Sequence, residues 1–435
     1  MDAPRLLCLF IFPVHFLLLI IAAIAGTTNP VEEYGRYSYL YGSNGFMDED
    51  GVLGVASMAS ANSTIGVNYG MVADNLPPPQ KAMELLKSLG ISKVKLYSAN
   101  SSTLQAFAKS GVSFIVGIGN EDLHSLSDSR SARAWVETHI IPYLSTIHIS
   151  AIAVGNEILT INDSRLVQDL LPAMLSLHSA LAEALPASYP RIAISTPHSL
   201  GILSSSYPPS AARFDPSAIN SLLHPLALFL SQTQSPFMIN AYPFFSYKYS
   251  PTTISLPYTL FLDNPGVKDM NSGLVYYNML DAQVDAVYYA LEAMGFPNIK
   301  VIVTETGWPS KGDASEPGAT KENAQLYNAN LMKHLARHRG TPKKPGIPLE
   351  AYIFALFNED SKPGPESERH YGLFKPDGTE AYDLGLRHDN PSQLASHNTF
   401  ISFSSDCACP CLTTLISRIL LSISLYALLT VSILV

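Results

Sequence analysis

The chain has 435 residues, of which 47% are hydrophobic and 14% charged, and its formal net charge is −9. This acidic balance argues against a nucleic-acid partner, because binding phosphates requires a basic face. Uncharged or weakly charged ligands remain compatible with it. The length suffices for one large α/β domain with its own core.

The N-terminal segment, residues 1–25, has the order of a secretory signal peptide. Arg5 precedes the apolar run "LLCLFIFPVHFLLLIIAAIAG", which ends in small residues at Ala23 and Ala25. The alternative is an uncleaved membrane anchor, since the run is nearly long enough to span a bilayer. Residues 26–63 are rich in Gly, Ser, Tyr and acids without a sustained period, and we expect a flexible lead-in there.

From residue 64 onward, apolar strands alternate with amphipathic helices. Continuous apolar strands of this kind predict a parallel sheet that is buried on both faces. Eight units predict a (β/α)8 TIM barrel over residues 64–388, with a doubly wound open sheet as the alternative. The expected strands are residues 64–70, 93–99, 112–120, 149–157, 191–196, 237–245, 299–306 and 349–359. The expected helices include "PPQKAMELLKSLG", "SARAWVETHIIPYLSTI", "DAQVDAVYYALEAMG" and "KENAQLYNANLMKHLARH".

Long segments follow the fifth and sixth expected strands. They read "PHSLGILSSSYPPSAARFDPSA" and "YPFFSYKYSPTTISLPYTLFLDNPGVKDMNSG". In a barrel of parallel strands the loops after the strands surround the mouth. We therefore expect these two segments to build walls around it.

The C-terminal segment resembles a lipid-attachment signal. Residues 389–405 form a polar linker, and residues 406–435 carry a short spacer and a terminal apolar run. This order is typical of a GPI signal that is removed on maturation, with Ser405 as the expected attachment residue and Ser404 or Asp406 also tenable. The alternative is a transmembrane tail.

The four cysteines lie at the two ends of the chain, at Cys8, Cys407, Cys409 and Cys411. The predicted barrel therefore contains no cysteine. A secreted domain without disulfides depends on its hydrophobic core for stability.

Two glutamates stand where strands end. The expected fourth strand finishes in "VGNE", which contains Asn156 and Glu157, and the seventh finishes in "TET", which contains Glu305. Residues that finish barrel strands face the active-site mouth, so both carboxylates should meet in one cavity. Such a pair is the minimal apparatus for hydrolysing a glycosidic bond.

The order of motifs resembles that of plant β-1,3-glucanases of glycoside hydrolase family 17. The matching stretches are "IGVNYG", "VKLYSAN", "VGIGNEDL", "VGNE", "NAYPFF", "VTETGWPSKG" and "FALFNEDSKPGPESERHYGLFKPDG", spread over about residues 64–386. The resemblance implies a (β/α)8 barrel that cleaves internal β-1,3 links in glucan with retention. It assigns Glu157 as general acid/base and Glu305 as nucleophile.

Further residues are candidates for substrate contact. Asn156 is placed to bond the sugar 2-hydroxyl, with a strand-end cap as its structural alternative. Tyr69, Tyr242, Trp308 and Phe357 fall near strand ends, where aromatic faces can support sugar rings, although core packing is the commoner role. In the strand-8 loop, Glu359, Lys362 and Glu368 match the family pattern, and we expect a supporting role for them.

His334 and His338 are four residues apart in a predicted helix, a spacing that can hold a metal ion. Neither a third ligand nor a helical glutamate accompanies them, so a surface helix is the preferred interpretation. The sequence also has no phosphate-cradling glycine loop. The two-glutamate mechanism requires no cofactor.

Three sequons, at Asn62, Asn100 and Asn162, are potential glycosylation sites. Asn100 and Asn162 follow strands 2 and 4, so glycans there would crowd the barrel mouth.

The combined hypothesis is a monomeric, GPI-anchored endo-β-1,3-glucanase that acts on callose at the outer face of the plasma membrane and in the cell wall. The alternatives within enzymes are 1,3;1,4-β-glucanase or glucan transglycosylase activity. The alternative of another class is a non-catalytic protein that binds wall glucan, and the presence of both glutamates argues against it.

Overall fold

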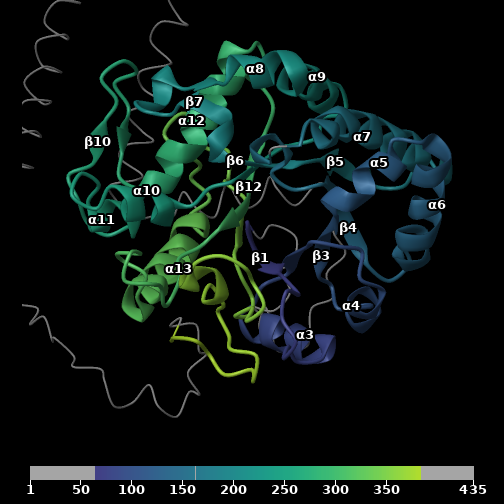
Figure 1. The fold of residues 1–435 in the computed structure, drawn as a ribbon, viewed down its shortest axis with the longest axis horizontal. Helices are drawn as coiled ribbons and strands as arrows, with labels where there is room; N and C mark the ends of the chain where they lie inside the picture. The colour runs from purple at the N-terminus through teal and green to yellow at the C-terminus, as the bar shows by residue number, and fades with distance from the viewer. Residues whose placement is uncertain (1–63, 162, 384–435) are drawn as a thin grey trace, which may run out of the picture. The chain divides into compact units, whose positions relative to one another are not determined.

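The structure is a computed structural model that describes residues 64–161 and 163–383 (Figure 1). The expected signal peptide, lead-in, linker and lipid-attachment signal lie outside these residues, as do Asn62, Asn162 and Ser405. No helix of the described part of the chain is long and apolar enough to cross a membrane.

The central element among the described residues is a nine-stranded parallel sheet with the order β5-β4-β3-β2-β1-β13-β12-β9-β6. Its strands are β1 (Ile65–Tyr69), β2 (Lys93–Leu96), β3 (Ser113–Ile118), β4 (His148–Val154), β5 (Ala193–Ser195), β6 (Pro197–Ser199), β9 (Phe237–Asn240), β12 (Val301–Thr306) and β13 (Ala351–Ile353).

Strands β5 and β6 are two halves of one extended segment, separated by Thr196 alone. The first half pairs with β4, where Ala193 opposes Ala151, and the second pairs with β9, where Pro197 opposes Met238. The two edges of the sheet therefore meet on a single stretch of chain. This closure confirms the predicted eight-unit barrel and excludes the open doubly wound sheet.

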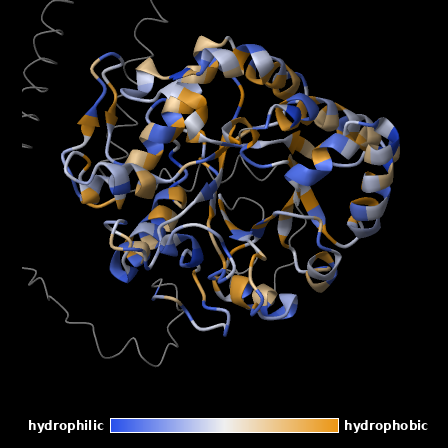
Figure 2. Cartoon of the chain, viewed as in Figure 1, coloured by the Kyte–Doolittle hydropathy of each residue, from blue (hydrophilic) through white to orange (hydrophobic). Residues whose placement is uncertain are grey.

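Apolar side chains fill both sides of the sheet. A small cluster inside the barrel joins Ile115, Ala151, Ala153, Met238, Ile302 and Tyr352. A much larger cluster lies between the strands and the surrounding helices. Figure 2 shows hydrophobic residues gathered on the central strands, whereas the peripheral helices carry both kinds of residue. The near-continuous apolar runs of the strands reflect this burial on two sides.

The helices follow the predicted alternation. They are α3 (Pro79–Ser88), α4 (Ser101–Ala106), α5 (Leu123–Leu126), α6 (Ser129–His139), α7 (Ser164–Ala184), α8 (Pro216–Ala218), α9 (His224–Gln232), α10 (Pro243–Tyr249), α11 (Leu256–Thr259), α12 (Met279–Ala293) and α13 (Lys321–Leu335). Local signals set their ends: Pro79 begins α3, and Gly90 follows it with a positive φ of 66°. Side chains of Asn278 and Thr320 cap α12 and α13.

The long segments after β6 and β9 build an additional layer beside α12 (Figure 1). It contains the β7–β8 hairpin (Leu203–Ser205 and Arg213–Phe214), α10, α11 and the β10–β11 hairpin (Val267–Lys268 and Val275–Tyr276). The predicted strand over 237–245 is wrong in its second half. It ends at Asn240, because Pro243 occupies the first turn of helix α10.

The eighth predicted strand, over 349–359, is also shorter than expected. Strand β13 ends at Ile353, and Phe354 and Ala355 are joined by a cis peptide bond. The segment beyond it pairs through an isolated bridge between Phe357 and Phe374. A short 3₁₀ helix, η8 (Glu366–Arg369), follows in the loop.

Candidate active site

Glu305 is the second-to-last residue of strand β12 and is only 7% exposed. The chain then leaves the sheet through Gly307. A Cβ atom at Gly307 would lie 2.2 Å from the carbonyl oxygen of Phe354, so only glycine allows the neighbouring strand segment to approach so closely. The Gly-Trp-Pro turn thus holds the end of β12 against the segment that follows β13.

Three side chains hydrogen-bond the Glu305 carboxylate. Lys95 Nζ and Tyr97 Oη donate to Oε1 at 2.8 and 2.7 Å, and Tyr242 Oη donates to Oε2 at 2.9 Å. The Lys95 and Glu305 side chains are 2% and 9% exposed, so this ion pair is almost completely removed from water. The carboxylate is therefore held in one orientation by partners from β2 and from the end of β9.

Opposing influences set the charge of Glu305. Burial alone would raise its pKa, but the positive charge of Lys95 and the hydrogen bonds from Lys95 and Tyr97 outweigh burial and hold the pKa below its usual value. Burial lowers the pKa of the Lys95 ammonium group, and the charge of Glu305 opposes that shift. The pair thus favours an ionised carboxylate at position 305.

Glu157 follows strand β4 and has a left-handed backbone, with φ of 56°. Such a conformation is uncommon for a residue other than glycine and persists only where neighbours enforce it. The backbone N–H of Glu157 donates to the carbonyl of Pro197 at 2.9 Å, which ties this turn to strand β6. Backbone strain of this kind is commonly found at functional sites, where it fixes the direction of a side chain.

Asn240 connects the two glutamates. Its Nδ2 donates to Glu157 Oε1 at 2.9 Å, and its backbone pairs with Glu305 across β9 and β12. The hydroxyl of Thr304 donates to Asn240 Oδ1 at 2.8 Å, which fixes the orientation of the amide. Because Oε1 of Glu157 accepts from Asn240, Oε2 is the oxygen available to carry a proton.

The pKa of Glu157 is raised above its usual value. Burial is the largest cause, and the negative charge of Glu305 adds to it, while the hydrogen bond from Asn240 and the charge of Lys95 oppose it. Asn240 bonds Glu157 and pairs with Glu305 across β9 and β12, which places the two glutamates in one site. Their pKa values move in opposite directions, which is the arrangement required for one proton donor and one ionised nucleophile.

Asn156 sits beside the acid in a fixed backbone. Its N–H donates to Asn120 Oδ1 at 2.7 Å, and Asn120 Nδ2 donates back to the Asn156 carbonyl at 3.2 Å. Asn240 Nδ2 also approaches Asn156 Oδ1 at 3.4 Å. The structure therefore brings Asn156 to the site, and its contact with the sugar 2-hydroxyl stays a prediction.

Three of the four predicted aromatic platforms are almost fully buried. Trp308 is 0% exposed, and its Nε1 donates to the Gly318 carbonyl at 2.7 Å. Tyr69 and Phe357 are 3% and 2% exposed and pack edge to face with ring centroids 5.9 Å apart. All three rings belong to the large hydrophobic cluster, and their contact with a sugar stays a prediction.

Tyr242, the fourth predicted platform, is half-buried and lies in the site through a hydrogen bond of its hydroxyl. Its hydroxyl binds Glu305, and its ring packs among Phe245, Phe354 and Tyr371. Tyr242 thus lies in the site as a partner of the nucleophile candidate.

The strand-8 loop brings Glu359, Lys362 and Glu368 to the edge of the site. Burial raises the pKa of both glutamates, and the charge of Lys362 opposes the shift in each. The Lys362 charge also lowers the pKa of Glu305. Glu359 accepts the Val72 N–H at 2.7 Å, and Lys362 Nζ lies 4.7 Å from the ring centroid of Phe354. These contacts fit the predicted supporting role.

Sequence reasoning missed Lys95 and Asn240, and it did not predict that the strand-end residue Tyr97 bonds Glu305. A signal was present, because Lys93 and Lys95 alternate along β2 and Tyr97 continues the pattern beyond its end. A charged residue at an inward position of a barrel strand needs a buried partner. Asn68 completes this group. Its Nδ2 donates to Tyr97 Oη at 3.2 Å and to the Thr304 carbonyl at 2.9 Å.

His334 and His338 lie in different environments. His334 Nε2 lies 3.0 Å from Asp281 Oδ1, whereas His338 is exposed beyond the end of α13. No cluster of three metal-ligating side chains occurs within residues 64–161 and 163–383.

Asn100 caps helix α4. Its Oδ1 accepts the Thr103 N–H at 2.9 Å and the Ser102 hydroxyl at 2.7 Å. Glycan attachment at its amide nitrogen stays a prediction.

Comparisons with known proteins agree with this geometry. The family described as Glycosyl hydrolases family 17 matches residues 65–386. The chain is 51% identical over 331 residues to glucan endo-1,3-beta-glucosidase 11 of Arabidopsis thaliana, covering 76% of this chain and 77% of that protein. It is 44% identical to a glucan endo-1,3-beta-D-glucosidase of Olea europaea, with 75% and 71% of the two chains covered.

Solved structures are similar over the same region. A β-1,3-glucanase and allergen of Cryptomeria japonica pollen has a TM-score of 0.71 and 42% identity, covering 75% of this chain and 99% of that one. A plant β-glucan endohydrolase, one of two with distinct substrate specificities, has a TM-score of 0.67 and 36% identity, with 73% and 99% covered. The family match, the similar proteins, the barrel and the paired glutamates all lead to the same conclusion. The chain belongs to glycosyl hydrolases family 17.

Proposed function

We propose that this protein hydrolyses internal β-1,3-glucosidic bonds in glucan by double displacement, with retention at the anomeric carbon. The observation that carries the proposal is the pair Glu157 and Glu305, whose pKa values are shifted in opposite directions within one site. The names of its relatives support β-1,3-glucan as the substrate.

In the first step the ionised Glu305 attacks the anomeric carbon of the sugar. Its Oε2 accepts one hydrogen bond, from Tyr242, whereas Oε1 accepts from both Lys95 and Tyr97. We therefore assign the attack to Oε2. As the glycosidic bond breaks, Glu157 gives its proton to the departing oxygen, and a covalent glycosyl ester on Glu305 remains.

In the second step Glu157, now ionised, takes a proton from a water molecule. The resulting hydroxide oxygen displaces Glu305 from the anomeric carbon, which frees the carboxylate and returns the original anomeric configuration. Asn240 holds Glu157 through both steps, because its amide can donate to the side chain in either protonation state, although the bond is stronger to the carboxylate. Both residues end in their starting protonation states.

The sequence supports the setting of this activity. A signal-like N-terminus, a GPI-like C-terminus and the expected attachment at Ser405 suit a monomeric enzyme on the outer face of the plasma membrane, where wall callose is the natural β-1,3-glucan. Release by phosphatidylinositol-specific phospholipase C tests the anchor. Persistence in the membrane after that treatment would favour a transmembrane tail.

The first experiment measures reducing sugars and product sizes on linear β-1,3-glucan, with the anomer of the first products followed by NMR. We expect mixed short oligosaccharides that appear first as the β-anomer, and their loss in the Glu305→Gln variant. Glu137→Gln, an exposed site on α6, is the matched control and should act as wild type. Initial α-anomer would contradict retention, and binding without release would favour the glucan-binding alternative.

The same assay on 1,3;1,4-β-glucan tests the alternative specificity. Plant endohydrolases of this fold have distinct substrate specificities. Faster release from the mixed-linked polymer would assign that substrate instead, whereas growth of longer chains from short donors would assign transglycosylation.

A further inference from the structure

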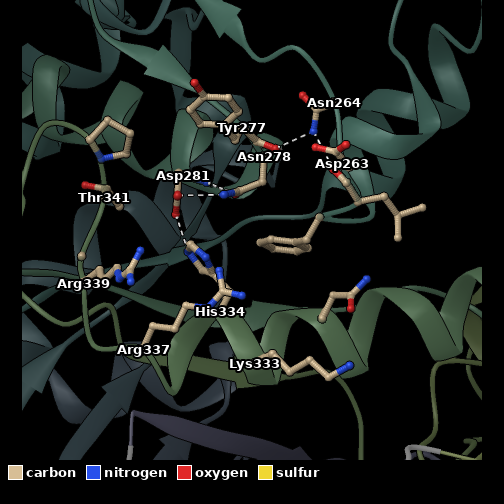
Figure 3. Close-up of a pocket in the computed structure, with 15 residues that line it drawn as sticks. Asp263, Asn264, Tyr277, Asn278, Asp281, Lys333, His334, Arg337, Arg339 and Thr341 are labelled. Atoms are coloured by element: carbon tan, nitrogen blue, oxygen red, sulfur yellow. Dashed lines mark hydrogen bonds and ion pairs between the residues drawn. The ribbon is translucent and has the colours of Figure 1, made fainter. Parts of the chain in front are cut away.

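A second pocket, of about 520 Å³, lies apart from the paired glutamates and shares no residue with the hydrogen-bonded group around Glu157 and Glu305. Three segments form it: the loop 261–264, the start of α12 with Tyr277 and Asn278 before it, and the end of α13 with the loop 339–342 (Figure 3).

The pocket is lined by cations. Lys333, Arg337 and Arg339 are exposed, and within the described residues none of their side chains makes an ion pair or hydrogen bond. Figure 3 shows them along the wall opposite Tyr277. Lys333 and Arg337 are four residues apart, and their like charges repel each other. The dipole of α13 favours Lys333 in its last turn, but it does not account for Arg337 and Arg339, which lie beyond the helix end at Leu335.

The acidic residues of the pocket do not neutralise this cluster. Asp281 is buried and already bonded to His334 at 3.0 Å and to Asn278 Nδ2 at 2.8 Å. Asp263 is exposed on the opposite side. Three cations therefore face one exposed carboxylate, that of Asp263, in a chain whose net charge is −9. A local excess of positive charge on an acidic protein attracts anions.

The walls of the pocket are held by hydrogen bonds. Asn264 Nδ2 donates to the carbonyls of Leu262 and Tyr277 at 2.7 and 2.8 Å. Asn330 Nδ2 on α13 donates to the Leu260 carbonyl at 2.9 Å. A pocket whose backbone is fixed in this way loses little entropy when a ligand enters.

Aromatic rings add a second kind of contact. Tyr277 is 62% exposed and projects beside the pocket (Figure 3). Phe261 packs against the His334 ring with centroids 5.3 Å apart. A flat aromatic face suits the C–H face of a sugar ring, and Arg binds carboxylates through paired N–H groups.

We propose that this pocket binds a uronate residue of an acidic polysaccharide, with its carboxylate against Arg337, Arg339 and Lys333 and its ring near Tyr277. The site is separate from the glucan site and does not depend on catalysis. It would hold the enzyme on an anionic polymer of the wall. An anionic membrane surface fits less well, because recognition of that kind uses about four to eight clustered cations.

The test is affinity electrophoresis of the full-length chain in gels that contain polygalacturonate, with EDTA to remove bridging calcium. We expect retardation at low salt that disappears as salt screens the charges. The variant Lys333→Gln/Arg337→Gln/Arg339→Gln should bind at least tenfold more weakly. The control Lys87→Gln/Arg130→Gln/Lys321→Gln removes three exposed cations elsewhere and should bind as wild type. Both should hydrolyse β-1,3-glucan normally.

Further probes separate charge from sugar recognition. Fully methyl-esterified polygalacturonate lacks the carboxylate and should not retard the protein, whereas Tyr277→Ala keeps the charge and should weaken binding severalfold. Equal binding by the first triple variant and its control would overturn the proposal. So would unchanged binding by Tyr277→Ala, or binding to phosphatidylserine vesicles without binding to polygalacturonate.

Discussion

Lys95 Nζ on β2 lies 2.8 Å from Glu305 Oε1 on β12, and the two residues are 210 positions apart in the chain. Both side chains are buried, so the pair exists only when the barrel brings these strands into one interior. Removing one partner of such a pair leaves a buried charge without compensation.

Lys95→Met should therefore shift the acid limb of the activity profile. The positive charge lowers the pKa of Glu305, so its loss raises that pKa, and the nucleophile becomes protonated at a higher pH. We expect kcat to fall at least tenfold and the acid limb to move upward. Lys93→Met, on the same strand but paired with Glu350 at 3.0 Å, is the control. An unmoved acid limb in Lys95→Met would contradict the role of the ion pair.

Asn240→Ala should shift the alkaline limb of the activity profile. The hydrogen bond from Asn240 lowers the pKa of Glu157, so removing it raises that pKa further, and the acid keeps its proton to a higher pH. The alkaline limb should move upward while kcat falls roughly 10- to 100-fold, the worth of a hydrogen bond to a charged group. The pH dependence of kcat measures both effects. Asn330→Ala, whose bond lies outside the site, should leave both unchanged.

Substitutions of Trp308 distinguish a role in core packing from a role in sugar binding. Trp308→Ala should lower the free energy of unfolding by about 3–5 kcal/mol, because a large buried ring is lost. Trp308→Phe keeps much of the volume and loses the bond to Gly318, so it should destabilise less and leave KM unchanged. Urea unfolding and glucan kinetics provide the two readouts. Wild-type stability with a raised KM in Trp308→Phe would restore the platform interpretation.

Glu316 should make stability depend on pH. It pairs with Lys248 at 2.7 Å and accepts the Ser367 hydroxyl at 2.6 Å, and these partners lower its pKa from 4.5 to about 2 although burial opposes them. A depressed pKa stabilises the fold above about pH 4.5, and the contribution is lost as pH falls towards 2. At about 1.4 kcal/mol per pH unit this contribution is roughly 3 kcal/mol.

The Glu316→Gln variant should therefore be less stable than wild type at pH 6, and the gap should close as pH falls to 2. Urea unfolding across this range measures it. Glu322→Gln, an exposed residue in the first turn of α13, should follow the wild-type curve. A constant gap between Glu316→Gln and wild type would show that charge is not the source of the stabilisation.

The barrel and both glutamates could be predicted because they depend on chain order. Parallel strands end at one edge, so residues that finish β4 and β12 must meet there. The direction of a side chain beyond a strand end is set by local turns instead. Tyr69, Trp308 and Phe357 therefore packed into the layers, whereas Tyr242 turned to Glu305. Lys95 escaped notice because its place in an apolar strand indicates that it needs a buried partner but does not identify Glu305 as that partner.

The junction between β5 and β6 has a consequence for how activity arises during folding. The carbonyl of Pro197 in β6 accepts the N–H of Glu157, and β6 joins the sheet only by pairing with β9. The proton donor is therefore anchored to the seam of the barrel, whereas the ion pair of the nucleophile joins β2 and β12, which are connected through β1 and β13 without crossing the seam. A chain whose seam has not closed would hold an ionised nucleophile without a positioned acid, so hydrolysis requires a closed barrel.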